Sequence, residues 1–88
     1  ALVNAGAKIG ANCIINSKAL VEHDSEIADH CHISTSSVVN GGVIIGSGTF
    51  IGSCAIIREG IKIGGNCFIA AGSIVTKSIA NNTFYRNL

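Results

Sequence analysis

The amino-acid sequence predicts an all-β fold, a parallel β-helix wound from short strands. A valine or isoleucine stands at every sixth position from residue 3 to residue 75, and a mostly small residue follows four places after each one. The sequence also contains no proline, which would remove a backbone donor from an interior strand. The aliphatic positions are Val3, Ile9, Ile15, Val21, Ile27, Ile33, Val39, Ile45, Ile51, Ile57, Ile63, Ile69 and Val75.

A period of six residues fits neither an amphipathic helix, with its period of about 3.6, nor an exposed strand, with its period of about 2. It fits a β-helix in which the chain turns a corner in every hexad, so that three hexads make one triangular coil. The thirteen hexads then give just over four coils. The inward aliphatic residues are β-branched, and each packs on its counterpart one coil away, at a spacing of about 4.8 Å.

The residue before each inward aliphatic residue should point outward, on one of three faces. Two faces are apolar and the third is mostly charged. Because apolar faces favour burial, and because cyclic three-fold assembly uses two faces of each subunit, we expect a homotrimer. The first face carries Leu20, Val38, Ile56 and Ile74; the second carries Ile14, His32, Phe50 and Phe68; the third carries Lys8, Glu26, Ile44, Lys62 and Ala80.

The residues four places after each aliphatic residue, here called the small-residue series or second series, should pack inside the coils. It includes three of the four cysteines, which we interpret as reduced, small inward residues rather than as redox or metal-binding groups. Glycines near the corners are expected to relieve crowding and to permit positive φ. The second series is Ala7, Cys13, Ala19, Ser25, Cys31, Ser37, Val43, Thr49, Ala55, Ile61, Cys67, Ser73 and Ile79, and the glycines are Gly10, Gly46, Gly52, Gly60 and Gly64.

The composition limits the possible functions and partners. A net charge of +1 gives no electrostatic footprint for nucleic acid. No apolar run reaches the about 18 residues that a membrane span requires. The chain has no methionine, so we expect it to begin partway into a longer protein and to be its C-terminal fragment. We expect the β-helix domain to cover residues 1–80 and a tail to cover residues 81–88.

The segment VEHDSEIADHCHIS, residues 21–34, holds all three histidines and four of the five acidic residues. Histidine, with a pKa near 6.5, can accept a proton at neutral pH. His23 is third in its hexad, at a corner where a side chain can leave the coil, and Asp24 can orient its imidazole. Gly41, one coil above His23, leaves room for a reacting atom, and its amide can donate to a developing oxyanion. A solvated surface histidine is the alternative for His23.

Over residues 3–80 the sequence resembles the hexapeptide-repeat acyltransferases, which form left-handed parallel β-helices and trimers. The histidine-rich segment, together with NGGVIIGSGTFIGSCAIIREG and FIAAGSIVTKS, is similar to bacterial sugar acetyltransferases of the sialic acid O-acetyltransferase and UDP-4-amino-sugar N-acetyltransferase type. The resemblance implies a cytoplasmic enzyme that transfers acetyl from acetyl-CoA to an amino or hydroxyl group of a sugar or nucleotide-sugar.

The same resemblance implies site residues. It implies that His23 is the general base, that Asp24 supports it, and that His32, Ser53 and Ala71 contact acetyl-CoA. His32 lies half a coil from His23, so we expect the two histidines to share a site across a subunit boundary; a packed interface histidine without a ligand is the alternative for His32. Ser53 and Ala71 are one coil apart on one edge, where an extended pantetheine arm can run along the axis.

Other residues of the chain carry weaker expectations. Lys77 and Arg86 could meet the phosphates of the ADP end, or they could be solvated side chains. His30 matches no motif position and is expected at the surface.

Three other functions fit a β-helix. A γ-type carbonic anhydrase needs histidines on widely separated coils for zinc, whereas these cluster, so we expect no metal. An ice-binding helix needs a flat face of repeated threonines, which this chain lacks. A non-catalytic β-helix trimerisation module is the main alternative to an enzyme, but it leaves the His23–Asp24 and Gly41–Gly42 pairs unexplained.

Overall fold

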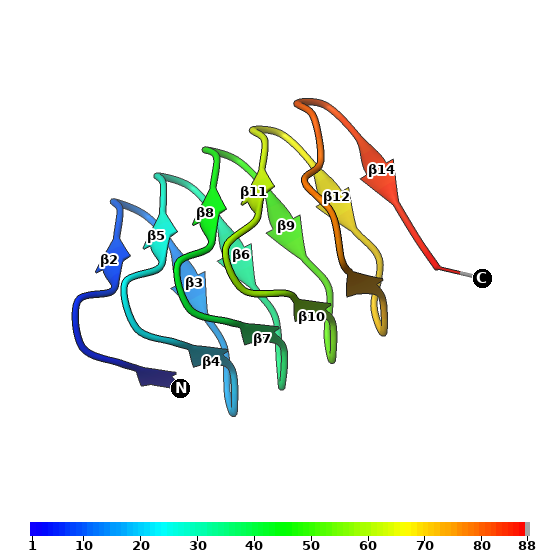
Figure 1. Ribbon diagram of the computed structural model, residues 1–88. Helices are drawn as coiled ribbons and strands as arrows, with labels where there is room; N and C mark the ends of the chain where they lie inside the picture. Colours follow the sequence, from blue (N-terminus) through cyan, green and yellow to red (C-terminus); the bar gives the residue numbers. More distant parts are fainter. Residues whose placement is uncertain (88) are drawn as a thin grey trace.

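The computed structural model describes residues 1–87, which form a solenoid of fourteen two-residue strands (Figure 1). The parallel β-helix predicted from the hexads is therefore confirmed. The strands are β1 (Leu2–Val3), β2 (Lys8–Ile9), β3 (Ile14–Ile15), β4 (Leu20–Val21), β5 (Glu26–Ile27), β6 (His32–Ile33), β7 (Val38–Val39), β8 (Ile44–Ile45), β9 (Phe50–Ile51), β10 (Ile56–Ile57), β11 (Lys62–Ile63), β12 (Phe68–Ile69), β13 (Ile74–Val75) and β14 (Phe84–Tyr85).

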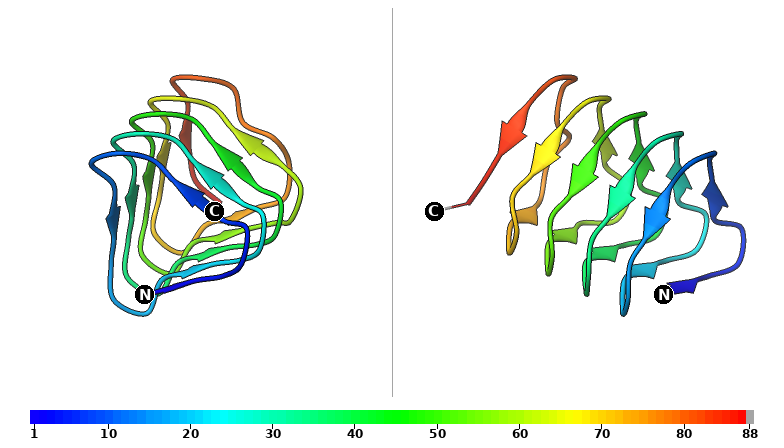
Figure 2. Two further views of the ribbon diagram at one scale, coloured as in Figure 1. Left: turned by 90° about the vertical axis from the view of Figure 1, so that its left-hand side faces the viewer. Right: turned by 180° about the vertical axis from the view of Figure 1, so that it is seen from behind.

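The strands form three parallel sheets, one along each side of a triangular prism. The first sheet has the order β1-β4-β7-β10-β13, the second β2-β5-β8-β11 and the third β3-β6-β9-β12-β14. Residues 18 apart are register partners through most of the prism, as Val21 and Val39 are. Seen from its N-terminal end, the chain turns anticlockwise as it recedes from the viewer, which is the expected left-handed sense (Figure 2, left).

The interior of the prism is a stack of aliphatic side chains. Ile33, Ile45, Ile51, Ile57 and Val75 are fully buried, as the hexad pattern predicts. Most members of the small-residue series are buried beside them, including the polar side chains of Ser25, Ser37 and Thr49. These hydroxyls keep hydrogen bonds: Thr49 Oγ1 donates to the carbonyl of Gly64 over 2.7 Å, and Ser25 Oγ donates to that of Asn40 over 2.7 Å. Ser37 Oγ donates to the carbonyl of Ser34 in its own coil, over 2.6 Å, so these three buried hydroxyls are paired, whereas Ser73 Oγ has no partner within residues 1–87.

The cysteines occupy the places that the pattern predicts. Cys31 and Cys67 are buried, Cys13 is half-buried in the first coil, and all four cysteines are free. The Cys31 thiol lies 3.2 Å from the carbonyl oxygen of Gly46, in the column that also holds Thr49. Burial raises the pKa of Cys31, so this thiol is disfavoured as a thiolate. Cys54, outside the series, is exposed at a corner.

Each corner up to residue 72 turns on one residue with positive φ, and these residues recur at intervals of six from Gly6 to Gly72. Within residues 1–87 eight positive-φ residues are not glycine, among them Asp24 (φ 59°) and His30 (φ 61°). Of the five glycines expected to serve this purpose, only Gly60 has positive φ. The other four fill a different need: a Cβ on Gly46, for example, would lie 2.5 Å from the backbone nitrogen of Gly65 in the next coil. Their absent side chains let neighbouring coils approach.

The last coil departs from the hexad. Ile79 pairs with Ile63, so it occupies an inward aliphatic position and not the small-residue position expected for it. The corner after Val75 is two residues shorter than the earlier ones, and Ser78, instead of Ala80, stands beside Lys62, whose amide donates to Ser78 Oγ over 3.0 Å. The expectation that Ala80 continues the third outward face was therefore wrong, because this corner is shortened.

The segment expected to be a tail contains strand β14. Phe84 pairs with Phe68 and Tyr85 pairs with Ile69, so the solenoid extends beyond residue 80 and its third sheet is five strands deep. Tyr85 packs against the core, and its hydroxyl donates to the carbonyl of Ile74 over 3.3 Å. The Asn87 side chain accepts a hydrogen bond from the Ile74 amide. Side chains of residues 85 and 87 thus make the hydrogen bonds to the backbone of β13 that the strand of a further coil would otherwise make. Leu88 lies outside the described residues.

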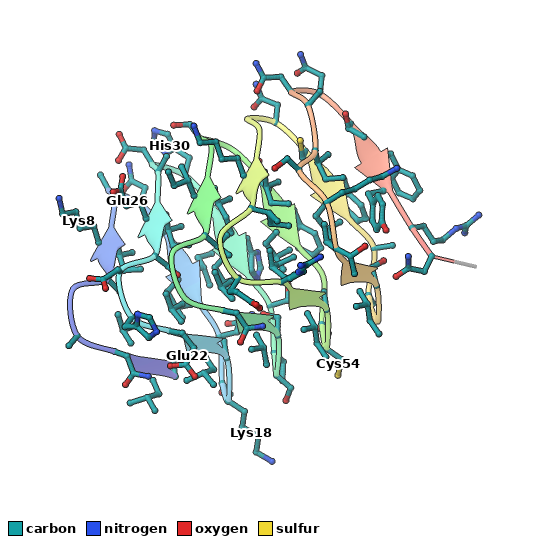
Figure 3. All side chains as sticks on the ribbon, viewed as in Figure 1. Lys8, Lys18, Glu22, Glu26, His30 and Cys54 are labelled. Carbon is teal, nitrogen blue, oxygen red and sulfur yellow. The ribbon has the colours of Figure 1, made fainter. Side chains whose placement is uncertain are left out.

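The outward faces are arranged as predicted. The first sheet exposes Ile56 and Ile74, and the third exposes Ile14, Phe68 and Phe84. On the third sheet the rings stack, with 4.8 Å between the centroids of Phe50 and Phe68. Figure 3 shows Lys8 and Glu26 projecting from the second sheet. No helix in residues 1–87 is long and apolar enough to cross a membrane.

Strand β8 provides a matched test of inward and outward positions. Ile45 is fully buried, whereas the adjacent Ile44 is 39% exposed. We predict that Ile45→Ala lowers the free energy of unfolding by about 2–5 kcal/mol, because it leaves a cavity between coils. Ile44→Ala should change it by about 0.5 kcal/mol or less. Denaturant titrations of both variants measure this difference, and equal losses would contradict the assignment of the two faces.

Candidate active site

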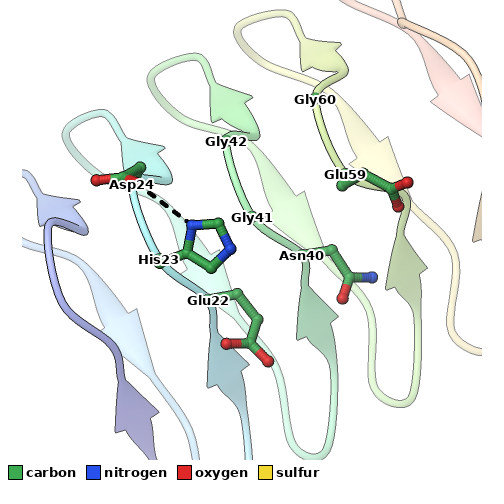
Figure 4. A pocket seen from close by; sticks show the side chains of 8 residues that line it. All are labelled: Glu22, His23, Asp24, Asn40, Gly41, Gly42, Glu59 and Gly60. Atoms are coloured by element: carbon green, nitrogen blue, oxygen red, sulfur yellow. Dashed lines mark hydrogen bonds and ion pairs between the residues drawn. The ribbon is translucent and has the colours of Figure 1, made fainter.

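His23 and Asp24 lie at the corner between the first and second sheets, whereas Asp29, His30 and His32 lie further along the coil. We call this edge the His23 corner; it comprises residues 22–25, 40–43 and 58–61 on three successive coils. A surface pocket of about 490 Å³ runs along it (Figure 4). The chain turns here at Asp24, which adopts a left-handed conformation that Asp tolerates better than most side chains. The pocket is lined by Glu22, His23, Asp24, Asn40, Gly41, Gly42, Glu59 and Gly60.

His23 and Asp24 interact directly. Nδ1 of His23 lies 3.3 Å from Oδ2 of Asp24, and both side chains are largely exposed. If the carboxylate accepts the Nδ1 proton, the Nε2 lone pair of the neutral ring is free to accept another proton. The structure therefore brings the two predicted residues into contact, in an arrangement that general base catalysis can use.

Gly41 packs against the imidazole. A Cβ on Gly41 would lie 2.7 Å from both Cε1 and Nε2 of His23, which is inside van der Waals contact. The glycine therefore leaves space for the ring itself, in addition to the space for a reacting atom expected from the sequence. Within residues 1–87 the Gly41 amide makes no hydrogen bond, whereas the Gly42 amide donates to the carbonyl of His23 over 3.0 Å. The Gly41 amide is therefore left without a partner within residues 1–87 and can donate to an oxygen atom of a ligand.

The three residues expected to contact acetyl-CoA lie elsewhere on the prism. His32 is in β6 on the third sheet, and Ser53 and Ala71 are at the corner between the third and first sheets. Ser53 and Ala71 are exposed on neighbouring coils, joined by a 2.8 Å hydrogen bond from the Gly72 amide to the Ser53 carbonyl. None of the three lines the pocket at the His23 corner. Within one chain the two groups of predicted site residues are therefore separate.

His32 is held in place on both sides. Its ring meets Phe50 edge-on, with 5.0 Å between centroids, and its Nε2 lies 2.9 Å from Nδ2 of Asn16. An amide nitrogen can only donate, so this contact assigns the proton of a neutral ring to Nδ1. Half-buried His32 then presents an N–H donor, and Asn16 is the residue that orients it.

Comparison with known proteins identifies the family. The family model described as bacterial transferase hexapeptide (six repeats) matches residues 6–41 and 42–77. The chain belongs to this hexapeptide-repeat transferase family. A comparison with curated proteins found no significant match.

The hexapeptide fold has close structural counterparts. A perosamine N-acetyltransferase from Caulobacter crescentus, in complex with CoA and GDP-perosamine, aligns with a TM-score of 0.93 and 31% identity, over 94% of this chain and 40% of that chain. The acetyltransferase domain of PglB from Neisseria gonorrhoeae, in complex with acetyl coenzyme A, aligns with a TM-score of 0.71 and 22% identity, over 94% and 49%. Serine acetyltransferase isoform 3 from Entamoeba histolytica, in complex with cysteine, aligns with a TM-score of 0.86 and 23% identity, over 94% and 33%. The hexapeptide chain thus spans less than half the length of each of these proteins.

Four polar residues near the two histidines were not predicted as site residues from the sequence. Glu22, Asn40 and Glu59 line the pocket because they stand in or beside the His23 column on successive coils. Asn16 contacts His32 across one coil. Stacking at intervals of 18 is the signal that could have found Glu59 above Gly41 and Asn40 above Glu22, but it places Ile14 and not Asn16 opposite His32. Among residues 1–87 no three His, Cys, Asp or Glu side chains gather as metal ligands would.

Two glycines that lack positive φ test the packing of His23. Gly41→Ala should leave stability nearly unchanged but displace the imidazole, because the exposed ring can rotate away from the new Cβ. Gly46→Ala should cost about 1–3 kcal/mol, because its Cβ would meet backbone that cannot move as easily. Imidazole chemical shifts and denaturant titrations separate the two effects. An unmoved His23 ring in the Gly41→Ala variant would contradict the packing described here.

Proposed function

We propose that this chain contributes to an acetyl-CoA-dependent acetyltransferase that acts on an amino or hydroxyl group of a sugar or nucleotide-sugar. The observation that carries the proposal is the His23–Asp24 pair in an open pocket, with the bare backbone of Gly41 against the imidazole. The hexapeptide family and the 31% identical perosamine N-acetyltransferase support the same chemistry.

In the proposed reaction His23 is the general base. Nε2 takes the proton of the acceptor amine or hydroxyl as that group attacks the thioester carbonyl carbon of acetyl-CoA. A new N–C or O–C bond forms, the C–S bond breaks, and the proton passes from His23 to the departing sulfur, which leaves as CoA thiol. Asp24 holds the imidazole and stabilises its charged form. The free Gly41 amide donates to the carbonyl oxygen as it becomes an oxyanion.

His32, Ser53 and Ala71 are proposed to hold acetyl-CoA. The Nδ1–H of His32 would donate to an oxygen of the bound molecule, since Asn16 occupies Nε2. Ser53 and Ala71 leave backbone accessible along one edge, where a pantetheine arm fits. Because these residues lie on other sides of the prism from His23, the complete site is proposed to form between subunits of a homotrimer. Exposed apolar side chains on the first and third sheets support such an assembly.

Replacement of the base is the direct test of the proposed function. His23→Ala in the full-length protein should lower the rate of acetyl transfer by about 10²–10⁴, the usual effect of losing a general base, and should leave acetyl-CoA binding intact. His30→Ala is the matched control, because this exposed histidine lies in the same segment but outside the pocket. Steady-state rates and calorimetric binding measure both. A His23→Ala enzyme with unchanged rate would exclude His23 as the base, whereas a full-length protein that transfers no acetyl group would favour the trimerisation module.

Mixed assemblies test the shared site. Subunits with His23→Ala and subunits with His32→Ala are each expected to be inactive or weakened. If the two histidines serve one site from different subunits, mixtures of the variants regain some intact sites and therefore activity. Sedimentation equilibrium should show three chains per particle. A stable monomer, or mixtures that stay inactive, would argue against a site between subunits.

A further inference from the structure

The charges that line the pocket at the His23 corner are unbalanced. Three lining residues are carboxylates, Glu22, Asp24 and Glu59, and the described lining includes no lysine or arginine. Arg58 is next to Glu59 in sequence but lies outside the lining, and its guanidinium donates to the carbonyl of Thr76 over 3.4 Å. A ligand in the pocket therefore meets negative charge from this chain.

The three carboxylates have different partners. Glu22 accepts a hydrogen bond from the Asn4 side chain, and Asp24 pairs with His23. Glu59 is exposed and has no hydrogen bond or ion pair within residues 1–87. Its carboxylate is the one that remains available to a ligand.

Glu59 lies at a defined place relative to the base. Glu59 stands in the column of His23, two coils further on, and Gly41 lies between the two residues. Backbone hydrogen bonds join these coils: the Gly42 amide donates to the His23 carbonyl, and the Gly60 amide donates to the Gly41 carbonyl, each over 3.0 Å. Two coils correspond to about 10 Å. The imidazole of His23 covers Gly41, since a Cβ there would lie 2.7 Å from its Nε2, whereas a Cβ on Gly60 would meet no atom within 4 Å (Figure 4). The open backbone of the pocket therefore lies beside Glu59, where a substituent of an acceptor can approach its carboxylate.

We propose that Glu59 is a specificity-determining residue that selects sugar acceptors bearing neutral or cationic groups and rejects sugars bearing a carboxylate. An ionised carboxylate only accepts hydrogen bonds, so it binds hydroxyl and ammonium groups and repels a second carboxylate. The repulsion is stronger in a partly enclosed pocket than in bulk water, because the effective dielectric constant is lower. This inference rests on the proposed function, since it assumes that the acceptor reacts at His23.

Three matched probes distinguish the charge classes: methyl 4-amino-4-deoxyglucoside, methyl glucoside and methyl glucuronide. Binding to the full-length protein with CoA present is followed by NMR at the amides of Gly41, Gly42 and Gly60. We expect the amine to bind most tightly and the glucuronide least. Glu59→Gln should weaken amine binding by about 5-fold, the upper range for an exposed charge pair, and should strengthen glucuronide binding. Glu59→Lys should reverse the preference.

Glu26→Gln is the matched control, because it removes the same charge from an exposed side chain on the second sheet, outside this pocket. It should leave all three affinities unchanged. The proposal is overturned if the glucuronide binds as well as the amine, if Glu26→Gln acts like Glu59→Gln, or if no probe binds. Acetyl transfer that depends on His23 but shows no Glu59-dependent preference would overturn this inference alone. Acetyl transfer that is independent of His23 would overturn the role of His23 on which this inference rests, and a full-length protein that transfers no acetyl group would overturn the proposed function.

Discussion

Backbone pairing between successive coils is the constraint on which the rest of the structure depends. Each strand is only two residues long and could not persist alone, but it pairs in parallel with the strands of neighbouring coils, 18 residues away except at β14. This register places each inward aliphatic residue on another one and each outward residue in a column. A one-residue slip would turn the buried isoleucines into water. The hexad therefore has to be kept through nearly the whole chain.

The candidate site is a product of the same stacking. His23, Gly41 and Glu59 are far apart in sequence but occupy one column, so the corner offers an imidazole, bare backbone and a carboxylate in that order. Gly41 shows how closely the site depends on this arrangement, because a single Cβ there would overlap the imidazole. The β-helix core contributes rigidity, while the chemistry stands on the corners, where side chains can leave the coil.

The prism also explains why one chain holds only part of the proposed site. His23 and the edge formed by Ser53 and Ala71 lie at different corners, and His32 lies on the third sheet. A rigid solenoid cannot fold one edge onto another, so these groups can meet only if a second copy supplies one of them. The apolar outward columns provide surfaces for that association. Membership of the hexapeptide-repeat transferases and the proposed general base chemistry are both compatible with this division.

The sequence by itself determined the fold class, the inward and outward faces and the outward position of His23, because a six-residue period has one structural solution and every member of the series obeys it up to Val75. It also placed Gly41 above His23. Only the tertiary structure showed that the corner after Val75 is shortened and that β14 continues the solenoid. Ile79 pairs with Ile63 and Tyr85 pairs with Ile69, each 16 residues away, so the 18-residue register of the earlier coils does not predict these pairs. The structure was also needed to show that Asn16 contacts His32 and that the carboxylate of Glu59 is free. Both features depend on side-chain directions, which the backbone conformation decides and the six-residue period does not.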